Sequence, residues 1–299
     1  MPVPVAAAMH ARQRRRTPHP QIRIGEQVFD VRRRALVVGI LNRTPDSFYD
    51  RGATWSFDQF LTRADQLVTG GADLLDVGGV KAGPGPEVSE AEELERVVPA
   101  IGALHERFDV PLSVDTWRAS VLDAACEAGA AVGNDISGFA DPEYLRVAAG
   151  HGATVVATHI RLRPRVPDPE PHYDDLVAQV SAFLVERARE AEAAGLVPDQ
   201  ILLDAGLDLG KTPAQSAVLL RETAEHASLG YPFLLSASNK RFIGELLNRD
   251  IEDRRAESLT ALAYGVIEGA RVVRVHDVTS SVRVVRVLEA ILQDGPATS

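Results

Sequence analysis

The residues best suited to chemistry stand at the ends of short apolar runs that are spread along the whole chain. These positions are Asn42, Asp76, Asp115, Asn134 with Asp135, His159, Asp204, Ser238 with Lys240, and Arg274 with His276. A single aspartate at the end of a strand is commonplace, because it can cap the helix that follows. Eight runs that all end in a hydrogen-bonding or charged group are hard to explain as caps alone. We therefore expect these side chains to line one site.

Three of these positions can read the edge of a flat, nitrogen-rich ring. Asp115, Asn134 and Asp204 offer carboxylate and amide groups that pair with ring N–H and amino groups. A carboxylate that is buried against an aminopyrimidine edge makes charge-assisted hydrogen bonds, which are stronger than neutral ones. The three side chains therefore favour a heterocycle as the ligand.

The remaining positions favour an anionic group attached to that ring. Lys240 and Arg274 supply positive charge, and arginine suits a phosphate or stacks on a ring. His276 and Asn42 can reach phosphate oxygens or a metal ion. The Gly-Lys-Thr run at 210–212 is not a phosphate-binding P-loop, because the residue five positions before its glycine is alanine where that motif requires glycine.

The elements that must position these groups alternate between strand and helix. Amphipathic stretches lie between eight short and nearly continuous apolar runs, as expected for parallel strands that are buried on both faces. The runs are 35–42, 73–79, 111–116, 130–137, 153–160, 200–206, 232–238 and 271–278. Most helical stretches end in a glycine (GGAD, EAGA, GHGA, AAGL, SLGY, EGAR), which supplies a left-handed helix cap. This unit, repeated eight times, predicts an α/β fold of the closed (β/α)8 TIM-barrel type.

The ends of the chain complete the predicted domain organisation. Residues 22–31 predict two short strands around a Gly-Glu turn, which form a β-hairpin that plugs the N-terminal mouth of the barrel. Residues 1–20 are expected to form a disordered tail, and residues 21–299 a single barrel domain. A chain of 299 residues is within the usual range for one such barrel.

Composition excludes several classes of partner. The longest apolar runs are strand-sized, so we expect neither a transmembrane helix nor a membrane partner. The net charge is −10 and the basic residues cluster only at 11–16, in the expected tail, so we expect no nucleic acid as partner. Cys126 is the single cysteine and cannot form an intramolecular disulfide, which favours a reducing compartment, the cytoplasm.

The chain resembles bacterial dihydropteroate synthase over roughly residues 35–290. The matching motifs are NRTPDSF (42–48), DVGG (76–79), SVDT (113–116), GNDISG (133–138), LDAGLDLGKT (203–212), SNKRFIG (238–244) and RVHDV (274–278). In this order and at these spacings they are highly specific. The resemblance implies a TIM-barrel transferase of folate biosynthesis. Such enzymes join 6-hydroxymethyl-7,8-dihydropterin pyrophosphate to p-aminobenzoate, release pyrophosphate and use Mg2+.

The resemblance also implies roles for individual side chains. The implied substrate-binding residues are Asp115, Asn134, Asp204, Lys240, Arg274 and His276. Among them, Arg274 matches a residue that stacks on the pterin and helps to hold phosphate. Asn42 matches a contact to pyrophosphate and Mg2+, and Asp50 matches the acidic residue of the first loop, 44–55. The candidate catalytic residues are therefore Asp50, Lys240 and Arg274, and the candidate metal ligand is Asn42.

Departures from the family pattern fall on the loops that would close over the second substrate. After DVGG the family has Glu-Ser-Thr-Arg-Pro-Gly, whereas this chain has VKAGPG, so Ala82 and Gly83 replace a threonine and an arginine. After the sixth strand, Asp208 replaces a glycine, and Leu209 replaces the phenylalanine that packs on p-aminobenzoate. In the next motif, Asn239 replaces an arginine. The changes therefore affect the phosphate and acceptor end, while the pterin-facing set is complete.

This contrast favours a dihydropteroate synthase homologue that keeps its pterin pocket but has weak or no synthase activity, similar to the divergent second paralogue of some actinobacteria. Two alternatives stay open. The first is an active synthase in which Lys81 or Arg43 swings onto the pyrophosphate. The second is a transferase of the same barrel type with another acceptor. The family resemblance further implies a homodimer formed through helices near the C-terminal end.

Overall fold

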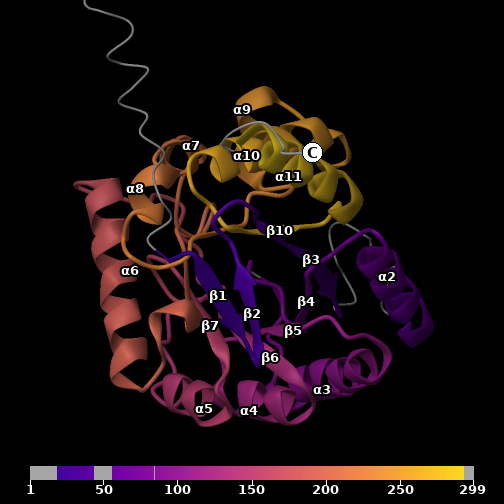
Figure 1. The fold of residues 1–299 in the computed structure, drawn as a ribbon. Coiled ribbons are helices and arrows are strands. Elements are labelled where there is room, and N and C mark those ends of the chain that lie inside the picture. Colours follow the sequence, from indigo (N-terminus) through magenta and orange to yellow (C-terminus); the bar gives the residue numbers. More distant parts are fainter. Residues whose placement is uncertain (1–18, 44–55, 84, 293–299) are drawn as a thin grey trace, which may run out of the picture.

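In the computed structural model, which describes residues 19–43, 56–83 and 85–292, strands and helices alternate in the predicted order (Figure 1). The barrel strands are β3 (Leu36–Asn42), β4 (Leu74–Gly78), β5 (Leu112–Asp115), β6 (Ala130–Asp135), β7 (Thr154–Thr158), β8 (Ile201–Asp204), β9 (Leu234–Leu235) and β10 (Val272–Val275). The helices are α2 (Phe57–Thr69), α3 (Glu90–Arg107), α4 (Ala119–Glu127), α5 (Tyr144–His151), α6 (Leu176–Ala193), α7 (Pro213–Arg221), α8 (Thr223–Ala227), α9 (Arg241–Leu247), α10 (Arg255–Ile267) and α11 (Val278–Leu292).

The strands form one parallel sheet that closes on itself. Within the described ranges the order is β8-β7-β6-β5-β4-β3-β10-β9. The two ends of this order meet where Leu203 of β8 pairs with Phe233, just before β9, and the Leu203 N–H donates to the Pro232 carbonyl at 3.0 Å. The helices surround the strands (Figure 1). The predicted (β/α)8 barrel is therefore confirmed.

The glycines that precede the strands adopt the predicted left-handed conformation. Their φ angles are all positive at Gly71, Gly129, Gly152, Gly195, Gly230 and Gly269. At Gly129 the angle is 113°, which an L-residue rarely adopts, and a side chain there would also collide with the ring of His105. Each of these glycines therefore follows a helix and turns the chain toward the next strand.

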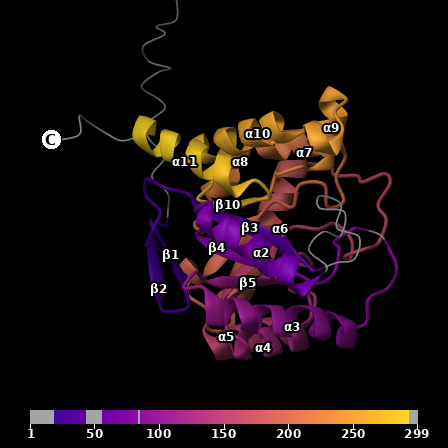
Figure 2. The ribbon, with the colours of Figure 1, turned by 90° about the vertical axis from the view of Figure 1, so that its right-hand side faces the viewer.

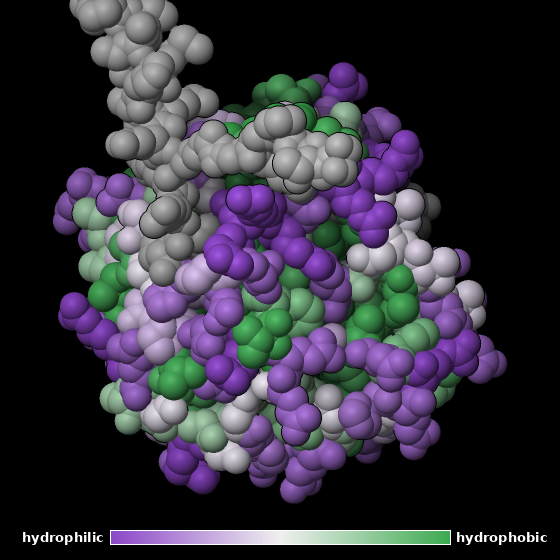
Figure 3. Space-filling view, in the orientation of Figure 1, coloured by the Kyte–Doolittle hydropathy of each residue, from purple (hydrophilic) through white to green (hydrophobic). Residues whose placement is uncertain are grey.

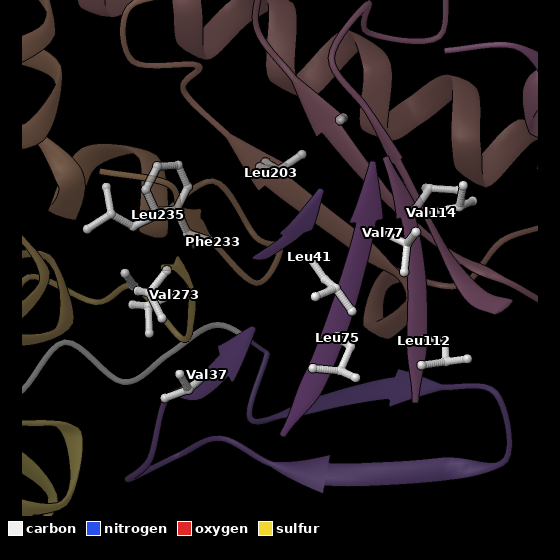
Figure 4. Close-up of a cluster of buried hydrophobic side chains, with 14 of the residues drawn as sticks. Val37, Leu41, Leu75, Val77, Leu112, Val114, Leu203, Phe233, Leu235 and Val273 are labelled. Atoms are coloured by element: carbon white, nitrogen blue, oxygen red, sulfur yellow. The ribbon is translucent and has the colours of Figure 1, made fainter. Parts of the chain in front are cut away.

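The core has two parts because successive side chains on a strand point to opposite faces. Outward-facing residues such as Val37, Leu75 and Leu203 pack between the sheet and the helices (Figure 4). Inward-facing residues form a smaller apolar cluster toward the N-terminal ends of the strands, with Val38, Leu74 and six others. Most inward positions nearer the C-terminal ends are polar, and these carry the site.

A hairpin closes the N-terminal end of the barrel, as predicted for residues 22–31. It consists of β1 (Gln21–Ile24) and β2 (Gln27–Asp30), which pair in antiparallel register. Ile22 and Ile24 are buried against the inner apolar cluster. The hairpin lies across the strands in Figure 1, and at the end opposite α9 in Figure 2. The face seen in Figure 3 is mainly hydrophilic, with its apolar side chains in small groups.

Part of the predicted domain organisation concerns residues outside the described ranges. The expected tail, 1–20, falls almost wholly outside the described residues, as does Asp50 in the first loop. The boundaries of the tail and of the single barrel domain, 21–299, therefore stay predictions. No helix in the described part of the chain is both long and apolar enough to cross a membrane.

Candidate active site

Arg274 of β10 lies at the centre of the polar end of the barrel. Its Nε donates to Asp76 Oδ2 at 2.6 Å, and its Nη2 donates to Asp115 Oδ2 at 2.8 Å. These two carboxylates come from β4 and β5, so one guanidinium links three strands. The predicted ring-stacking or phosphate-holding cation and a predicted pterin-facing carboxylate are thus in direct contact.

Asp76 anchors this network, although the sequence assigned it no specific role. It is 1% exposed and accepts hydrogen bonds from the Ser113 hydroxyl and from Asn134 Nδ2, the latter at 3.3 Å. The strand register explains the contacts, because Asp76 pairs with Ser113 and Asp115 pairs with Asn134. The alternation of side chains along the strand is the signal that could have identified Asp76, since it places Asp76 on the same face as Gly78, the partner of Asp115.

Gly78 leaves room between the candidate metal ligand and the carboxylate network. A Cβ atom at Gly78 would lie 3.3 Å from Asn42 Oδ1 and 3.7 Å from Asp115 Oδ2. These two oxygens therefore approach the same backbone from neighbouring strands. Within the described ranges, no group of three or more His, Cys, Asp or Glu side chains is arranged to hold a metal ion.

Burial raises the pKa of the two candidate pterin-binding carboxyls. Burial raises the pKa of Asp115 to about 7, against the opposing effect of the Arg274 guanidinium. Burial likewise raises the pKa of Asp204, against the Gly206 N–H, which donates to Asp204 Oδ1 at 2.7 Å, and the nearby Lys240. Both carboxyls are thus held in surroundings where a new N–H donor would strongly favour the ionised form.

Lys240 and His276 complete the predicted set from β9 and β10. Lys240 Nζ donates to the Leu207 carbonyl at 3.0 Å, which places its ammonium beside the loop after β8. His276 Nδ1 lies 3.0 Å from the Ser238 hydroxyl, and its backbone N–H donates to the same oxygen at 3.2 Å. Burial, together with Arg274 and Lys240, lowers the pKa of His276 to about 3. His276 is therefore a neutral hydrogen-bonding group at neutral pH.

Two strand-end residues that we expected in the site are structural instead. Asp135 follows Asn134 and so faces away from the barrel interior, where its carboxylate accepts from the N–H groups of Ser137 at 2.6 Å and Phe139 at 2.9 Å. His159 is buried, and its Nδ1 lies 2.9 Å from Lys211 Nζ. The expectation that all eight strand ends line one site was too broad, because residues at neighbouring positions point to opposite faces.

The lysine of the Gly-Lys-Thr run joins two loops through hydrogen bonds to backbone carbonyls. Lys211 Nζ donates to the carbonyls of His159 at 3.2 Å, Gly206 at 2.8 Å and Leu209 at 2.9 Å. Burial lowers the pKa of Lys211 to about 7. The side chain therefore ties the loop after β7 to the loop after β8, which carries Asp208 and Leu209. Sequence reasoning missed this role, since residue types and spacing do not show which backbone carbonyls a lysine side chain will reach.

Comparison with known proteins identifies the barrel. Residues 38–276 match the family model described as "Pterin binding enzyme". The chain is 40% identical over 275 residues to the dihydropteroate synthase of a Synechocystis species, with 91% of this chain and 95% of that protein covered. The chain belongs to the dihydropteroate synthase family.

The relatives of this chain include both dihydropteroate synthases and a paralogue named as inactive. The chain is 42% identical over 275 residues to the inactive dihydropteroate synthase 2 of Mycobacterium leprae, with 89% of this chain and 93% of that protein covered. Among solved structures, the Yersinia pestis dihydropteroate synthase with a sulfonamide drug is 38% identical, with a TM-score of 0.87. That match covers 91% of this chain and 98% of the Yersinia pestis chain. The chain is thus similar both to dihydropteroate synthases and to an inactive paralogue.

The loop after β4, where this chain departs from the dihydropteroate synthase pattern, is held by arginines from elsewhere. Arg96 donates to the Gly79 carbonyl at 2.7 Å, and Arg118 to the Val88 carbonyl at 2.8 Å. Arg165, from the loop after β7, donates to the carbonyls of Lys81, at 3.3 Å, and of Pro86. The loop after β7 therefore supports the loop beside the site.

Arg43, which follows β3, extends toward two aromatic rings of α2 in this structure. Its guanidinium lies 5.5 Å from the ring centroid of Phe57 and 5.3 Å from that of Phe60. Stacking on these rings directs the charge toward α2.

Proposed function

We propose that this chain binds 6-hydroxymethyl-7,8-dihydropterin pyrophosphate in the mouth of the barrel and has weak or no dihydropteroate synthase activity. One observation carries the proposal: Asp115, Asn134 and Arg274 converge on a single buried network, while the loop after β4 has alanine and glycine at the threonine and arginine positions. Binding groups are kept where the ring would lie, and donors are lost where charge would develop.

The pterin ring would replace the internal partners of the network. Its N–H and amino groups would donate to Asp115 and Asp204, and Asn134 would pair with the ring edge. In the structure Arg274 Nη2 donates to Asp115 Oδ2 at 2.8 Å. A ring donor at Asp115 would release that guanidinium, which could then stack on the ring face or hold a phosphate.

The pyrophosphate end would use Lys240, His276 and Asn42. The ammonium of Lys240 supplies charge, and the neutral imidazole of His276 supplies a hydrogen-bond donor. The amide oxygen of Asn42 is the type of ligand that Mg2+ prefers, and phosphate oxygens would complete the coordination. When bound, Mg2+ would neutralise charge on the departing pyrophosphate. We propose Lys240, Arg274 and Asp50 as the catalytic residues, with Asp50 outside the described part of the chain.

Weak turnover follows from the donors that the loops have lost. The loss of one oriented donor to a developing charge typically reduces the rate by about 10² to 10³. Both the threonine and the arginine of the family are missing after β4, and Arg43 is stacked on two aromatic rings. These observations favour the weakly active homologue over the fully active synthase. A transferase with a different acceptor agrees with them only if that acceptor needs fewer contacts from the loop after β4.

We further propose a cytoplasmic homodimer. The presence of a single cysteine supports the compartment. Exposed apolar residues on α10 and α11 support the dimer: Tyr264 and Ile267 are 37% and 47% exposed, and Val287 and Ile291 are 57% and 69% exposed. The two helices pack side by side (Figure 1), so these residues could form one contact surface.

The test is pyrophosphate release by the purified chain with the pterin pyrophosphate, p-aminobenzoate and Mg2+, beside an active family member. We expect a rate lower by a factor of about 10² or more. The Ala82→Thr/Gly83→Arg double variant should recover part of it, because a side chain at Gly83 meets no atom within 4 Å. Gly150→Arg, equally open but on α5, is the matched control and should recover none. Turnover by the unmodified chain at the rate of the active enzyme would contradict the proposal.

A further inference from the structure

Asp208 adopts a backbone conformation that glycine adopts more readily. Its φ angle is 66°, in the left-handed region that favours glycine, and the family pattern has glycine at this position. A non-glycine residue in this conformation persists when its side chain makes compensating contacts. We therefore expect the carboxylate of Asp208 to make contacts that stabilise this conformation.

The contacts of Asp208 join two loops at the rim of the mouth. Its Oδ2 accepts from the Arg241 N–H at 2.6 Å, and its Oδ1 accepts from the Phe242 N–H at 3.3 Å. Ser216 of α7 holds both the side chain and the backbone of Asp208. The Ser216 hydroxyl donates to Asp208 Oδ1 at 3.3 Å and accepts from the Asp208 N–H at 3.0 Å. The carboxylate is thus fixed in one orientation.

These contacts lie directly beside a proposed substrate-binding residue. Arg241 follows Lys240 in the chain, and Lys240 Nζ donates to the carbonyl of Leu207, the residue before Asp208. Both backbone N–H groups that begin α9 are consequently occupied by a side chain of this protein, and a negative charge is placed at this edge of the mouth. A ligand anion would therefore have to compete with Asp208 for these two N–H groups.

We propose that Asp208 determines acceptor specificity by excluding a second substrate that carries a carboxylate, so that the acceptor this barrel tolerates is an uncharged or cationic amine. This inference rests on the proposed pterin site, because an acceptor must approach a pterin that is already held there. An acceptor carboxylate near Lys240 would find the adjacent N–H groups taken and would face the like charge of Asp208. Two like charges in one partly desolvated site repel strongly, whereas an amide of the same shape is not repelled.

The experiment is calorimetric titration of the full chain, first with the pterin pyrophosphate and then, on the saturated protein, with two probes. The probes are p-aminobenzoate and p-aminobenzamide, which share the ring and the amine and differ in charge. We expect the unmodified chain to bind the amide at least as tightly as the acid. In the Asp208→Gly variant the acid should bind roughly tenfold more tightly, and the amide should change by less than about threefold.

Two further variants keep the result interpretable. Asp208→Asn retains an oxygen that can cap α9 and removes the charge, so the acid should gain affinity even if the glycine variant loosens that helix. Asp174→Gly removes an exposed aspartate from another loop and should leave both affinities unchanged. Equal affinity for p-aminobenzoate in the unmodified chain and in both Asp208 variants would overturn the inference alone. If the unmodified chain does not bind the pterin pyrophosphate, the proposed function and this inference fail together.

Discussion

Replacing Arg274 by methionine tests the central network of the site. Arg274 is the partner of two inward-facing carboxylates, Asp76 at 2.6 Å and Asp115 at 2.8 Å. Methionine keeps much of the volume and removes the charge. Removal of one partner from a buried ion pair typically costs about 3–5 kcal/mol, because a charge stays buried without compensation. We expect a loss of this size in the free energy of unfolding at pH 8.

The loss should shrink at low pH, and the sign follows from Asp115. Burial raises the pKa of this carboxyl to about 7, and Arg274 opposes the rise. A carboxyl with a raised pKa binds more protons in the folded state, so its contribution to stability falls as pH rises from its unfolded value toward its folded value. Without Arg274 the folded pKa moves higher still, and each added unit corresponds to about 1.4 kcal/mol. At pH 5 the carboxyl is protonated in both proteins, so the cost should be about 1–2 kcal/mol smaller there.

The assay is urea unfolding followed by circular dichroism at pH 5 and pH 8. The control is Arg146→Met, which breaks a surface pair with Glu143 in which both side chains are more than half exposed. That change should cost less than about 1 kcal/mol at either pH. If Arg274→Met costs no more than this control, or costs the same at both pH values, the ion network does not have the role assigned to it here.

Two other predictions follow from residues outside the mouth. Burial lowers the pKa of His226 to about 4, so the folded state binds fewer protons than the unfolded chain between pH 4 and 6.5; stability is lost as pH falls through this window, by about 2 kcal/mol from pH 7 to pH 5. Urea unfolding of His226→Phe should show a smaller difference between these pH values, while His172→Phe, at a histidine whose side chain is 83% exposed, should match the unmodified chain. In light-scattering chromatography the Val287→Asp/Ile291→Asp variant should elute as a monomer, whereas Leu162→Asp, at an exposed apolar residue on the loop after β7, should remain dimeric; an unmodified chain that is monomeric at micromolar concentration would contradict the proposed dimer.

The barrel could be predicted from the sequence because its signals are local. Apolar runs of strand length, amphipathic stretches of helix length and the glycines before strands are each encoded within a few residues. The run 232–238 shows the limit of this reasoning, because only Leu234–Leu235 forms strand there. The hairpin over 22–31 could also be predicted from the sequence, since a Gly-Glu turn between two short strands needs no distant partner.

The candidate site could be predicted from the sequence only in part. The sequence by itself determined which polar residues stand at strand ends, and it correctly brought Asp115, Asn134 and Arg274 into one group. It did not separate Asn134 from Asp135, which follow each other on one strand and point to opposite faces, because the sequence left open which of the two faces the barrel interior.

The tertiary structure alone decided which side chains meet. Arg274 reaches Asp76 across 198 residues of chain, Lys211 binds carbonyls from two loops, and Asp208 occupies the N–H groups that begin α9. Each contact depends on how the closed barrel staggers its strands and orients its loops. These are long-range properties, and no local pattern of residue types encodes them. The physical reason is that chain closure sets the distances between residues far apart in sequence, whereas periodicity sets only the direction of each residue within its own element.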